Sequence, residues 1–466
     1  MLKKIQDYIE AHEQEMLENA MALISINSEK MEAKPGMPFG EGCAEALFKA
    51  EEILKGHGFE TKNYDNYVLT ADLNDKPARL DILAHLDVVP AGEGFTVTDP
   101  FCPMVKDGLL YGRGSADDKG PAVAALYAMR AVRELSPELS GNCRLILGTD
   151  EECGSADIRY YYDREKEAPM TFSPDADFPL INIEKGGLSM SFTAEAEIAA
   201  KGVRLLSAQA GTKINVVPGK AHALIAGAGF AEMEIIAARA TERTGAAFVM
   251  EECEEGIRVR AEGEFCHAAS PEKGNNALTA LLFFLAEVPF SDEKLRGLFK
   301  SLTALFPHGD WNGKALGVNH EDEESGELTL SFDLFSYDGK VMTGAFDCRA
   351  PLCATEENTR DVIFDKLTQA GFAPDDSHMR APHYVPETSE FVQTLLFCYE
   401  EVTGKREKPL AIGGGTYVHH LENGVAFGCG DPAVDNRMHG PDEFMSVEQM
   451  KKSAVIFAMA ILKLCR

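Results

Sequence analysis

LDILAHLDVV, residues 80–89, is apolar at nearly every position and yet carries His85 and Asp87. So apolar a run is typical of a strand buried on both faces, as in a parallel sheet covered by helices. Further along the chain come a turn-rich segment, YGRGSADDKGP (111–121), a helical pattern, AVAALYAMRAVREL (122–135), and a second apolar run that ends in acids, CRLILGTDEE (143–152). This alternation of strand, loop and helix predicts an α/β domain with a mostly parallel central sheet.

The pattern of the chain changes after Gly187 and changes back near Pro382. Before Gly187, helices are also expected at 2–25 and 41–55 and a strand at 67–73. From 189 to about 264, apolar and polar residues alternate, which is typical of half-exposed antiparallel strands. Helices at 275–288, 292–304 and 355–370, strands at 327–335 and 340–348, and later helices at 389–403 and 446–464 complete the pattern. We therefore expect one α/β domain, residues 1–187 and 385–466, interrupted by an inserted α+β domain at 188–384.

The amino-acid composition indicates which binding partners and which cellular compartment to expect for the protein. The 466 residues include 45 Lys and Arg against 75 Asp and Glu, a net charge of −30. Such an acidic surface repels nucleic-acid phosphates and anionic membranes, so neither is an expected partner. The eleven cysteines form no CxxC pair, which favours reduced thiols. With no secretory signal and no apolar stretch of 18 residues, the sequence predicts a cytoplasmic protein.

Charged side chains stand where the predicted buried strands end. His85 and Asp87 lie two residues apart on one strand and should point the same way, as a metal-binding imidazole and an orienting carboxylate would. Further acids and one histidine lie at later strand ends and loops: Asp117, Asp118, Glu151, Glu152, Asp175 and His439. Several acids gathered at one rim are costly unless a cation neutralises them. Histidine and carboxylates without a thiolate suit Zn²⁺ or Mn²⁺ in a hydrolytic site.

Each of these residues taken alone also has a purely structural interpretation. His85 on an apolar strand could be a hydrogen-bonded core histidine. The acid pairs at 117–118 and 151–152 could be helix starts, where the helix dipole favours negative charge. Asp175 could be a turn residue and His439 a loop residue. The combination of all of them at successive strand ends favours the metal site.

The motifs together resemble a known family. HLDVVPAGEGF, DPFCPMVKDGLLYGRGSADDKGP, LGTDEECGS, SPDADFP, INVVPGKA and DNRMHGPDE follow one another in the order found in M20 metallopeptidases. The long insert, with HLDVVPAGEG and GRGSADDKGP, is similar to the PepV-like dipeptidase branch. The resemblance runs from about residue 10 to the C-terminus. It implies a zinc-peptidase-like catalytic domain and makes the insert a lid domain.

The resemblance also implies a site with two divalent metal ions. His85 and Asp175 match ligands of the first metal, Glu152 and His439 match ligands of the second, and Asp117 matches the carboxylate that bridges them. The bond from Asp117 to Asp118 is often cis in the family. Asp87 matches the carboxylate behind the first histidine, and Glu151 matches the general base. Zn²⁺ is the first expectation, with Mn²⁺ or Co²⁺ as alternatives, because sites built from His and carboxylates accept several metals.

The remaining matches concern the substrate. In the insert, Asn215 and His267 match residues that reach into the site, with His267 as donor to the reaction's oxyanion, and Arg349 matches the clamp for a substrate carboxylate. Gly414, Gly415 and Thr416 match a substrate-binding loop. A free substrate amine could pair with an acid such as Asp118. One departure is Phe95, where the branch leads us to expect Trp.

These matches imply a metal-dependent dipeptidase that cleaves unblocked dipeptides. Two alternatives stay open at this point: an N-acyl amino acid deacylase of the same family, and a metal-dependent peptide-binding protein without catalysis. The expected partner is a small peptide. A monomer is favoured over a dimer, because the enlarged insert takes over the role that a partner's lid has in other relatives.

Overall fold

The computed structural model describes residues 1–135, 138–196 and 200–466. These residues form two compact units, each with a hydrophobic core of its own. The first unit comprises 1–183, 383–410 and 415–466, and the second comprises 184–382 and 411–414. None of the helices in the described part of the chain has the length and apolar character that crossing a bilayer requires.

The first unit is built on a nine-stranded sheet with the order β1-β2-β6-β3-β7-β24-β9-β22, in which β23 also pairs with β9. The four central strands, β6, β3, β7 and β24, run parallel, as expected for the catalytic domain. Antiparallel pairing of β1, β2 and β9 makes the sheet mixed at its margins. The strands are β1 (Glu60–Tyr64), β2 (Val68–Asp72), β3 (Ala78–His85), β6 (Asn142–Gly148), β7 (Met170–Ser173), β9 (Ile181–Glu184), β22 (His383–Tyr384), β23 (Leu410–Ile412) and β24 (Gly424–Ala426).

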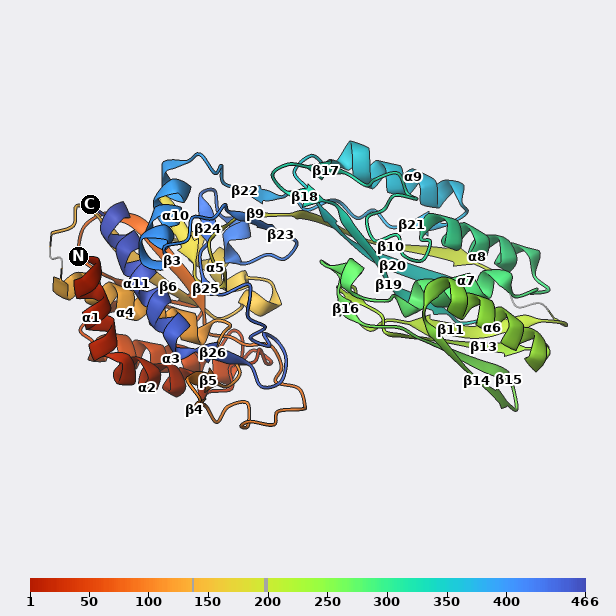
Figure 1. The fold of residues 1–466 in the computed structure, drawn as a ribbon, viewed down its shortest axis with the longest axis horizontal. Helices are drawn as coiled ribbons and strands as arrows, with labels where there is room; N and C mark the ends of the chain where they lie inside the picture. Colours follow the sequence, from red (N-terminus) through yellow and green to blue (C-terminus); the bar gives the residue numbers. More distant parts are fainter. Residues whose placement is uncertain (136–137, 197–199) are drawn as a thin grey trace. The chain divides into compact units, whose positions relative to one another are not determined.

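Helices pack on both faces of this sheet. Leu80, Ile82 and Ala84 of β3 face the main hydrophobic core, in which α4 and α11 lie side by side (Figure 1). The intervening Asp81 pairs with Arg144, whose guanidinium lies over the ring of Tyr161 in α5 on the opposite face. The helices are α1 (Leu2–Ala11), α2 (Glu13–Ile24), α3 (Glu41–Gly56), α4 (Lys119–Leu135), α5 (Ala156–Tyr162), α10 (Glu390–Thr403) and α11 (Val447–Leu464).

Short elements complete the first unit around the ends of the parallel strands. They are β4 (Met104–Lys106), β5 (Leu109–Tyr111), β8 (Ala176–Asp177), β25 (Cys429–Gly430), β26 (Phe444–Ser446) and the 3₁₀ turns η1 (Glu151–Cys153) and η4 (Tyr417–His420). β26 pairs with β5, which joins a C-terminal segment to the loop before α4. β25 pairs with β8, which joins the same region to the loop after β7. These two strand pairs bring distant parts of the sequence to one edge of the sheet.

The second unit is an antiparallel sheet with helices packed on one face (Figure 1). Its strand order is β14-β15-β13-β11-β19-β20-β10-β21, and the helices share one hydrophobic core with it. The main strands are β10 (Gly186–Glu195), β11 (Arg204–Ala210), β13 (Lys220–Ala226), β14 (Ala247–Cys253), β15 (Gly256–Glu262), β19 (Thr329–Tyr337), β20 (Val341–Ala350) and β21 (Ala373–Pro374). The helices are α6 (Phe230–Thr244), α7 (Ala277–Glu287), α8 (Glu293–Leu305) and α9 (Asp361–Gln369), the last preceded by a π-turn, η3 (Glu356–Arg360). Minor elements are β12 (Val216–Val217), β16 (Cys266–His267), η2 (Pro271–Lys273), β17 (Glu321–Asp322) and β18 (Gly326–Glu327).

The boundaries between the two units lie a few residues away from the predicted domain boundaries. The predicted divisions at 187/188 and 384/385 become Ile183/Glu184 and Pro382/His383. β10 already begins at Gly186, and Gly187 is paired with Arg349 inside the second sheet, so these residues go with the insert. The short segment 411–414 also belongs to the second unit.

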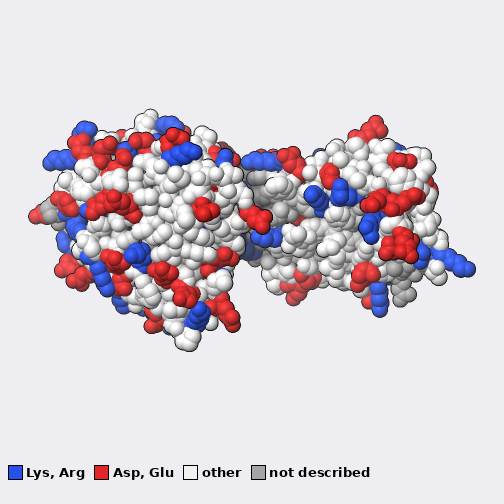
Figure 2. All heavy atoms as spheres, turned by 90° about the horizontal axis from the view of Figure 1, so that it is seen from below, with Lys and Arg blue, Asp and Glu red and all other residues white. Residues whose placement is uncertain are grey.

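The surface charge is mixed locally although the net charge is strongly negative. On the face drawn in Figure 2, Asp and Glu side chains are spread over both units, with Lys and Arg side chains between them.

Candidate metal centre

His85 ends the central strand β3 and is completely buried. Its Nδ1 lies 3.0 Å from the main-chain oxygen of Asp87, and because a carbonyl only accepts, Nδ1 carries the hydrogen. The Asp87 carboxylate also lies 3.4 Å from Nδ1. These contacts leave Nε2 as the nitrogen that can bind a metal. β3 stops at His85, so Asp87 meets the imidazole from the loop and not, as predicted, from the same strand.

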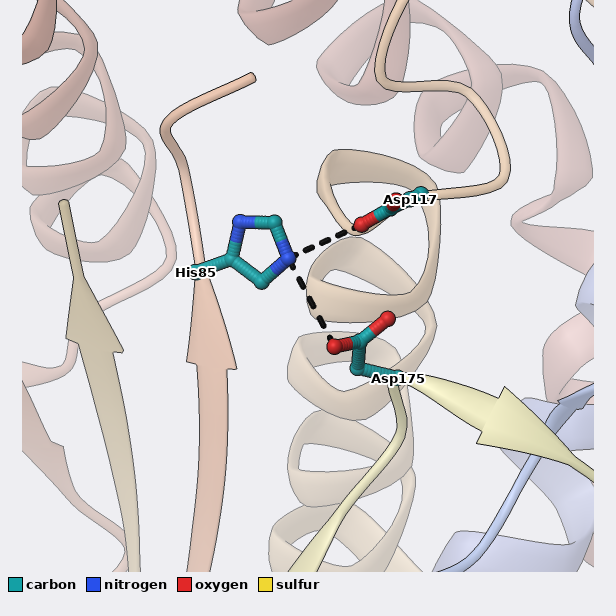
Figure 3. A group of neighbouring side chains, drawn as sticks. All are labelled: His85, Asp117 and Asp175. Carbon is teal, nitrogen blue, oxygen red and sulfur yellow. Dashed lines mark hydrogen bonds and ion pairs between the residues drawn. The ribbon is translucent and has the colours of Figure 1, made fainter. Parts of the chain in front are cut away.

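Asp117 divides its carboxylate between two histidines. Oδ1 lies 2.9 Å from Nε2 of His85, and Oδ2 lies 2.8 Å from Nε2 of His439. Asp175, in the loop after β7, approaches the first histidine, with Oδ2 at 3.7 Å from Nε2 (Figure 3). Glu152 approaches the second, with Oε1 at 3.2 Å from Nε2 of His439. One carboxylate is therefore common to two groups of possible ligands.

The two groups have the composition of metal sites. His85, Asp117 and Asp175 each offer a ligand atom within 4.8 Å of the others, and so do Asp117, Glu152 and His439. Each group supplies one imidazole nitrogen and two carboxylates, a donor set that divalent transition metals accept. The chemistry of these residues fits a pair of divalent cations that share Asp117.

Glu443 holds the loop that carries Asp117. Oε1 of Glu443 accepts the backbone N–H groups of Gly114, Ala116 and Asp117 at 3.1, 2.9 and 3.3 Å. Its other oxygen pairs with Arg113, and both side chains are buried. This role was not predicted from the sequence, because an acid after HGP has no pattern that distinguishes it. The bond between Asp117 and Asp118 is cis, as the resemblance implied.

Glu151 and Glu152 lie in the turn η1 and not at the end of a strand, because β6 stops at Gly148. The backbone N–H groups of the two glutamates donate to the Asp87 carboxylate at 3.2 and 3.1 Å. Asp87 therefore orients His85 and fixes the acidic turn at the same time. Glu151 belongs to neither ligand group among the described residues.

Burial and crowding of acids shift the pKa values of the centre. Burial raises the pKa of Glu151, and the charge of Asp175 raises it further. Burial and then the charge of Asp117 likewise raise the pKa values of Glu152 and Asp175. Hydrogen bonds to Asp117 and Glu152 raise the pKa of His439 to about 11. These shifts share one cause, because the crowded carboxylates make added negative charge unfavourable and positive charge favourable. The centre therefore favours the binding of a cation.

Asp118, the neighbour of Asp117, supports the end of β3. It is completely buried, and its Oδ2 accepts the backbone N–H of His85 at 3.1 Å. This hydrogen bond gives Asp118 a structural role at the end of β3, and its pairing with a substrate amine stays a prediction.

Asp157 and Tyr417 form a support behind the centre that was likewise not predicted. The Tyr417 hydroxyl donates to Asp157, whose Oδ2 also accepts the backbone N–H groups of Thr149 and Asp150 at 2.6 and 2.8 Å. The Tyr417 ring stands edge-on to the His85 ring, with 6.2 Å between the ring centroids. A tyrosine at the start of a short 3₁₀ turn carries no sequence pattern that reveals such a contact.

The predicted substrate residues lie mainly in the second unit. Asn215 and His267 are neighbours there, since the carbonyl of Asn215 accepts the N–H of Ala268 at 3.0 Å and Val216 pairs with His267. Arg349 donates through Nε to Asp347 at 2.7 Å and through Nη1 to the Gly413 carbonyl at 2.8 Å. Gly414 follows in the same unit, whereas Gly415 and Thr416 belong to the first unit, where Thr416 accepts the N–H of Val418 at 3.3 Å.

Comparison with known proteins identifies the family of this chain. The model of peptidase family M20/M25/M40 matches residues 82–463. YtjP of Bacillus subtilis (strain 168) is 35% identical over 467 residues, which cover 97% of this chain and 98% of that protein. The Beta-Ala-Xaa dipeptidase of Lactobacillus delbrueckii subsp. lactis is 33% identical over 473 residues, which cover 99% of this chain and 98% of that protein.

Solved structures with low sequence identity share the fold. Human carnosine dipeptidase 1 matches with a TM-score of 0.61 and 16% identity, covering 100% of this chain and 98% of that one. The dipeptidase Dug1p of Saccharomyces cerevisiae matches with a TM-score of 0.59 and 12% identity, covering 99% of this chain and 98% of that one. With the family model and the relatives above, the conclusion is that this chain belongs to peptidase family M20 and is a metallopeptidase.

Proposed function

We propose that the protein is a dipeptidase that uses two divalent metal ions, Zn²⁺ first among them, to hydrolyse unblocked dipeptides. The observation that carries the proposal is the division of the Asp117 carboxylate between His85 and His439 at 2.9 and 2.8 Å. The dipeptidases among the relatives and fold neighbours support the choice of substrate.

The proposed ligands are His85 and Asp175 for one ion, Glu152 and His439 for the other, and Asp117 for both. When bound, such a pair of ions polarises a carbonyl and makes water acidic enough to ionise near neutral pH. Asp87 keeps the hydrogen of His85 on Nδ1 and thereby keeps Nε2 available as a ligand.

Glu151 is the proposed general base. Its backbone is fixed by Asp87 at 3.2 Å, while its side chain is outside both ligand groups and keeps its carboxylate for proton transfer. It would take a proton from the attacking water and give it to the leaving amine.

Residues of the second unit have proposed roles in holding the substrate. His267 would donate a hydrogen bond to the developing oxyanion, beside Asn215. Arg349 would bind the C-terminal carboxylate through the fork that Asp347 and Gly413 hold in place. The segment Gly414, Gly415 and Thr416 would line the substrate's path. Binding both ends of a short peptide would select dipeptides by length.

The deciding experiment is hydrolysis of Ala-Leu by metal-stripped protein before and after addition of Zn²⁺ or Mn²⁺. We expect cleavage only after metal is added, and much slower cleavage of Ala-Leu amide, which lacks the carboxylate. N-acetyl-leucine and N-succinyl-leucine serve as the comparison substrates. Preference for these acyl amino acids would replace the proposal with a deacylase, and binding of Ala-Leu without any product would replace it with a binding protein.

The proposal includes a cytoplasmic monomer. All eleven cysteines are free thiols in the structure, which suits a reducing compartment. Sedimentation at micromolar concentration is expected to give the mass of one chain, and an obligate dimer would contradict the monomer.

A further inference from the structure

Two arginines of the second unit stand on either side of a glycine in one row across the sheet. Arg349 of β20 pairs directly with Gly187 of β10, and Gly187 pairs on its other side with Arg380. The pairing to Arg380 is close, with N–H to carbonyl distances of 2.7 and 3.0 Å. Directly paired residues of an antiparallel sheet project on the same face. The two arginine Cα atoms are therefore about 10 Å apart, at two strand spacings, and share one face.

The glycine leaves room between the two side chains. An open pocket of about 370 Å³ is lined there by Gly187, Ser189, Asp347, Arg349, Ser377, His378 and Arg380. Ser189 and Asp347 form the next row of the same sheet, and the Ser189 hydroxyl donates to Asp347 at 3.1 Å. Every lining residue belongs to the second unit, so this unit alone forms the pocket.

The two guanidinium groups differ in how firmly they are held. Asp347 and the carbonyl of Gly413 engage two of the five N–H donors of Arg349, which fixes the plane of its fork. Arg380 makes a long contact, 3.4 Å, from Nη2 to the carbonyl of Lys185. Loss of surrounding water and then the charge of Arg349 lower the pKa of Arg380, although Glu184 and Asp347 act in the opposite direction. An anion between the two arginines would relieve this repulsion.

We propose that Arg380 is a specificity-determining residue that binds the side-chain carboxylate of a C-terminal Glu or Asp while Arg349 binds the α-carboxylate of the same residue. The preferred substrates are then dipeptides of the Xaa-Glu and Xaa-Asp type. This inference rests on the proposed function for the role of Arg349, but the pocket itself does not depend on it. The two carboxylates of one acidic residue lie a few ångströms apart, and two long arginine side chains separated by glycine can converge on them.

Comparison of Ala-Glu with Ala-Gln, which has the same shape without the charge, tests the proposal. We expect the wild-type protein to prefer Ala-Glu in kcat/KM, chiefly through KM. In Arg380→Met, the ratio of Ala-Glu to Ala-Gln should fall about 10- to 100-fold, the value of one charge-assisted hydrogen bond. Arg239→Met is the matched control, because it removes the same charge from α6, where Arg239 pairs with Glu287 at 3.3 Å. An unchanged ratio in Arg380→Met, or an equal fall in Arg239→Met, would overturn the proposal.

Binding of glutarate, a simple dicarboxylate, tests the pocket without catalysis. Calorimetry on the full chain should detect glutarate binding that Arg380→Met weakens at least tenfold. Gly187→Val should abolish it by filling the space between the arginines, and a Cβ there meets its nearest atom, the Cys348 carbonyl oxygen, at an ordinary 3.4 Å. If the wild-type protein cleaves no dipeptide, the proposed function fails while this titration still decides the pocket. Equal glutarate binding by the wild-type protein and both variants would refute the pocket.

Discussion

Glu151 and Glu152 are adjacent in one turn, and only Glu152 belongs to a ligand group. We therefore expect Glu151→Gln to retain both metal ions and to lose activity by about 10²- to 10⁴-fold in kcat, the usual contribution of a general base. Metal content by mass spectrometry of the desalted protein, measured beside dipeptide hydrolysis, checks both parts.

Glu152→Gln provides the comparison for that variant. It differs from Glu151→Gln by one position and should lose metal as well as activity, because its carboxylate lies 3.2 Å from Nε2 of His439. If Glu151→Gln loses an ion to the same extent, the general-base assignment is wrong.

Metal affinity should rise with pH. The pKa of His439 is raised to about 11, so at neutral pH the metal-free side chain carries a proton that a metal ion must displace. Affinity should therefore increase by up to tenfold per pH unit between pH 6 and 8, and binding should release protons. Calorimetric titration with Zn²⁺ in two buffers of different ionisation enthalpy measures this release. A pH-independent affinity with no proton release would contradict His439 as a ligand.

At the scale of single residues, the type of side chain and its order along the chain were enough to point to residues that lie close together in the structure. Of the acids and histidines predicted at strand ends, the structure gathers His85, Glu152, Asp175 and His439 around Asp117. The supporting residues Glu443, Asp157 and Tyr417 were missed, because their roles arise from hydrogen bonds between segments far apart in the sequence. Arg380 was missed for the same reason, since its partner in the row, Gly187, precedes it by nearly the whole insert.

At the scale of elements, the end of β6 requires a residue without a side chain. A Cβ on Gly148 would lie 2.1 Å from the Tyr417 hydroxyl and 2.4 Å from Oδ2 of Asp157. Gly148→Ala should therefore separate β6 from this buried support and lower the free energy of unfolding by about 1–3 kcal/mol, the usual cost of overpacking. Urea unfolding followed by circular dichroism measures the change.

Gly56→Ala is the control for that substitution. Gly56 is the last residue of α3, and a Cβ there would meet nothing within 4 Å. Alanine should be neutral or stabilise the helix by up to about 1 kcal/mol, because glycine is the poorer helix former. Equal destabilisation by both substitutions would show that contact with Tyr417 and Asp157 is not the cause.

The helices predicted at 275–288, 292–304, 389–403 and 446–464 lie within two residues of α7, α8, α10 and α11, whereas the exact ends and breaks of other elements were not predictable. The predicted helix at 2–25 is two helices, α1 and α2, which meet at His12, and the periodicity of the apolar residues continues across the break. No helix was predicted over α6, because alanines make up much of its buried face and give little apolar signal. β3 and β6 end before the predicted positions, since a run of apolar and acidic letters does not show where pairing stops.

At the scale of the molecule, an insertion was predictable because the character of the strands changes. Buried strands before Gly187 and alternating strands after it correspond to a sheet with two covered faces and a sheet with helices on one face. The assignment of 411–414 to the second unit was not predictable, because the division falls inside one strand, β23, between Leu410 and Ala411.

The separate hydrophobic cores of the two units predict that metal stabilises one of them selectively. All proposed metal ligands lie in the first unit, while the single tryptophan, Trp311, lies in the second. Zn²⁺ at a hundred times its dissociation constant should stabilise the first unit by about 2.7 kcal/mol per ion and raise its unfolding temperature by roughly 5–10 °C. Tryptophan fluorescence, which reports on the second unit, should show an unchanged midpoint in the same sample, while calorimetry shows the shifted transition. If the tryptophan midpoint rises equally with the metal, the two units unfold as one and the prediction of separate stabilities is wrong.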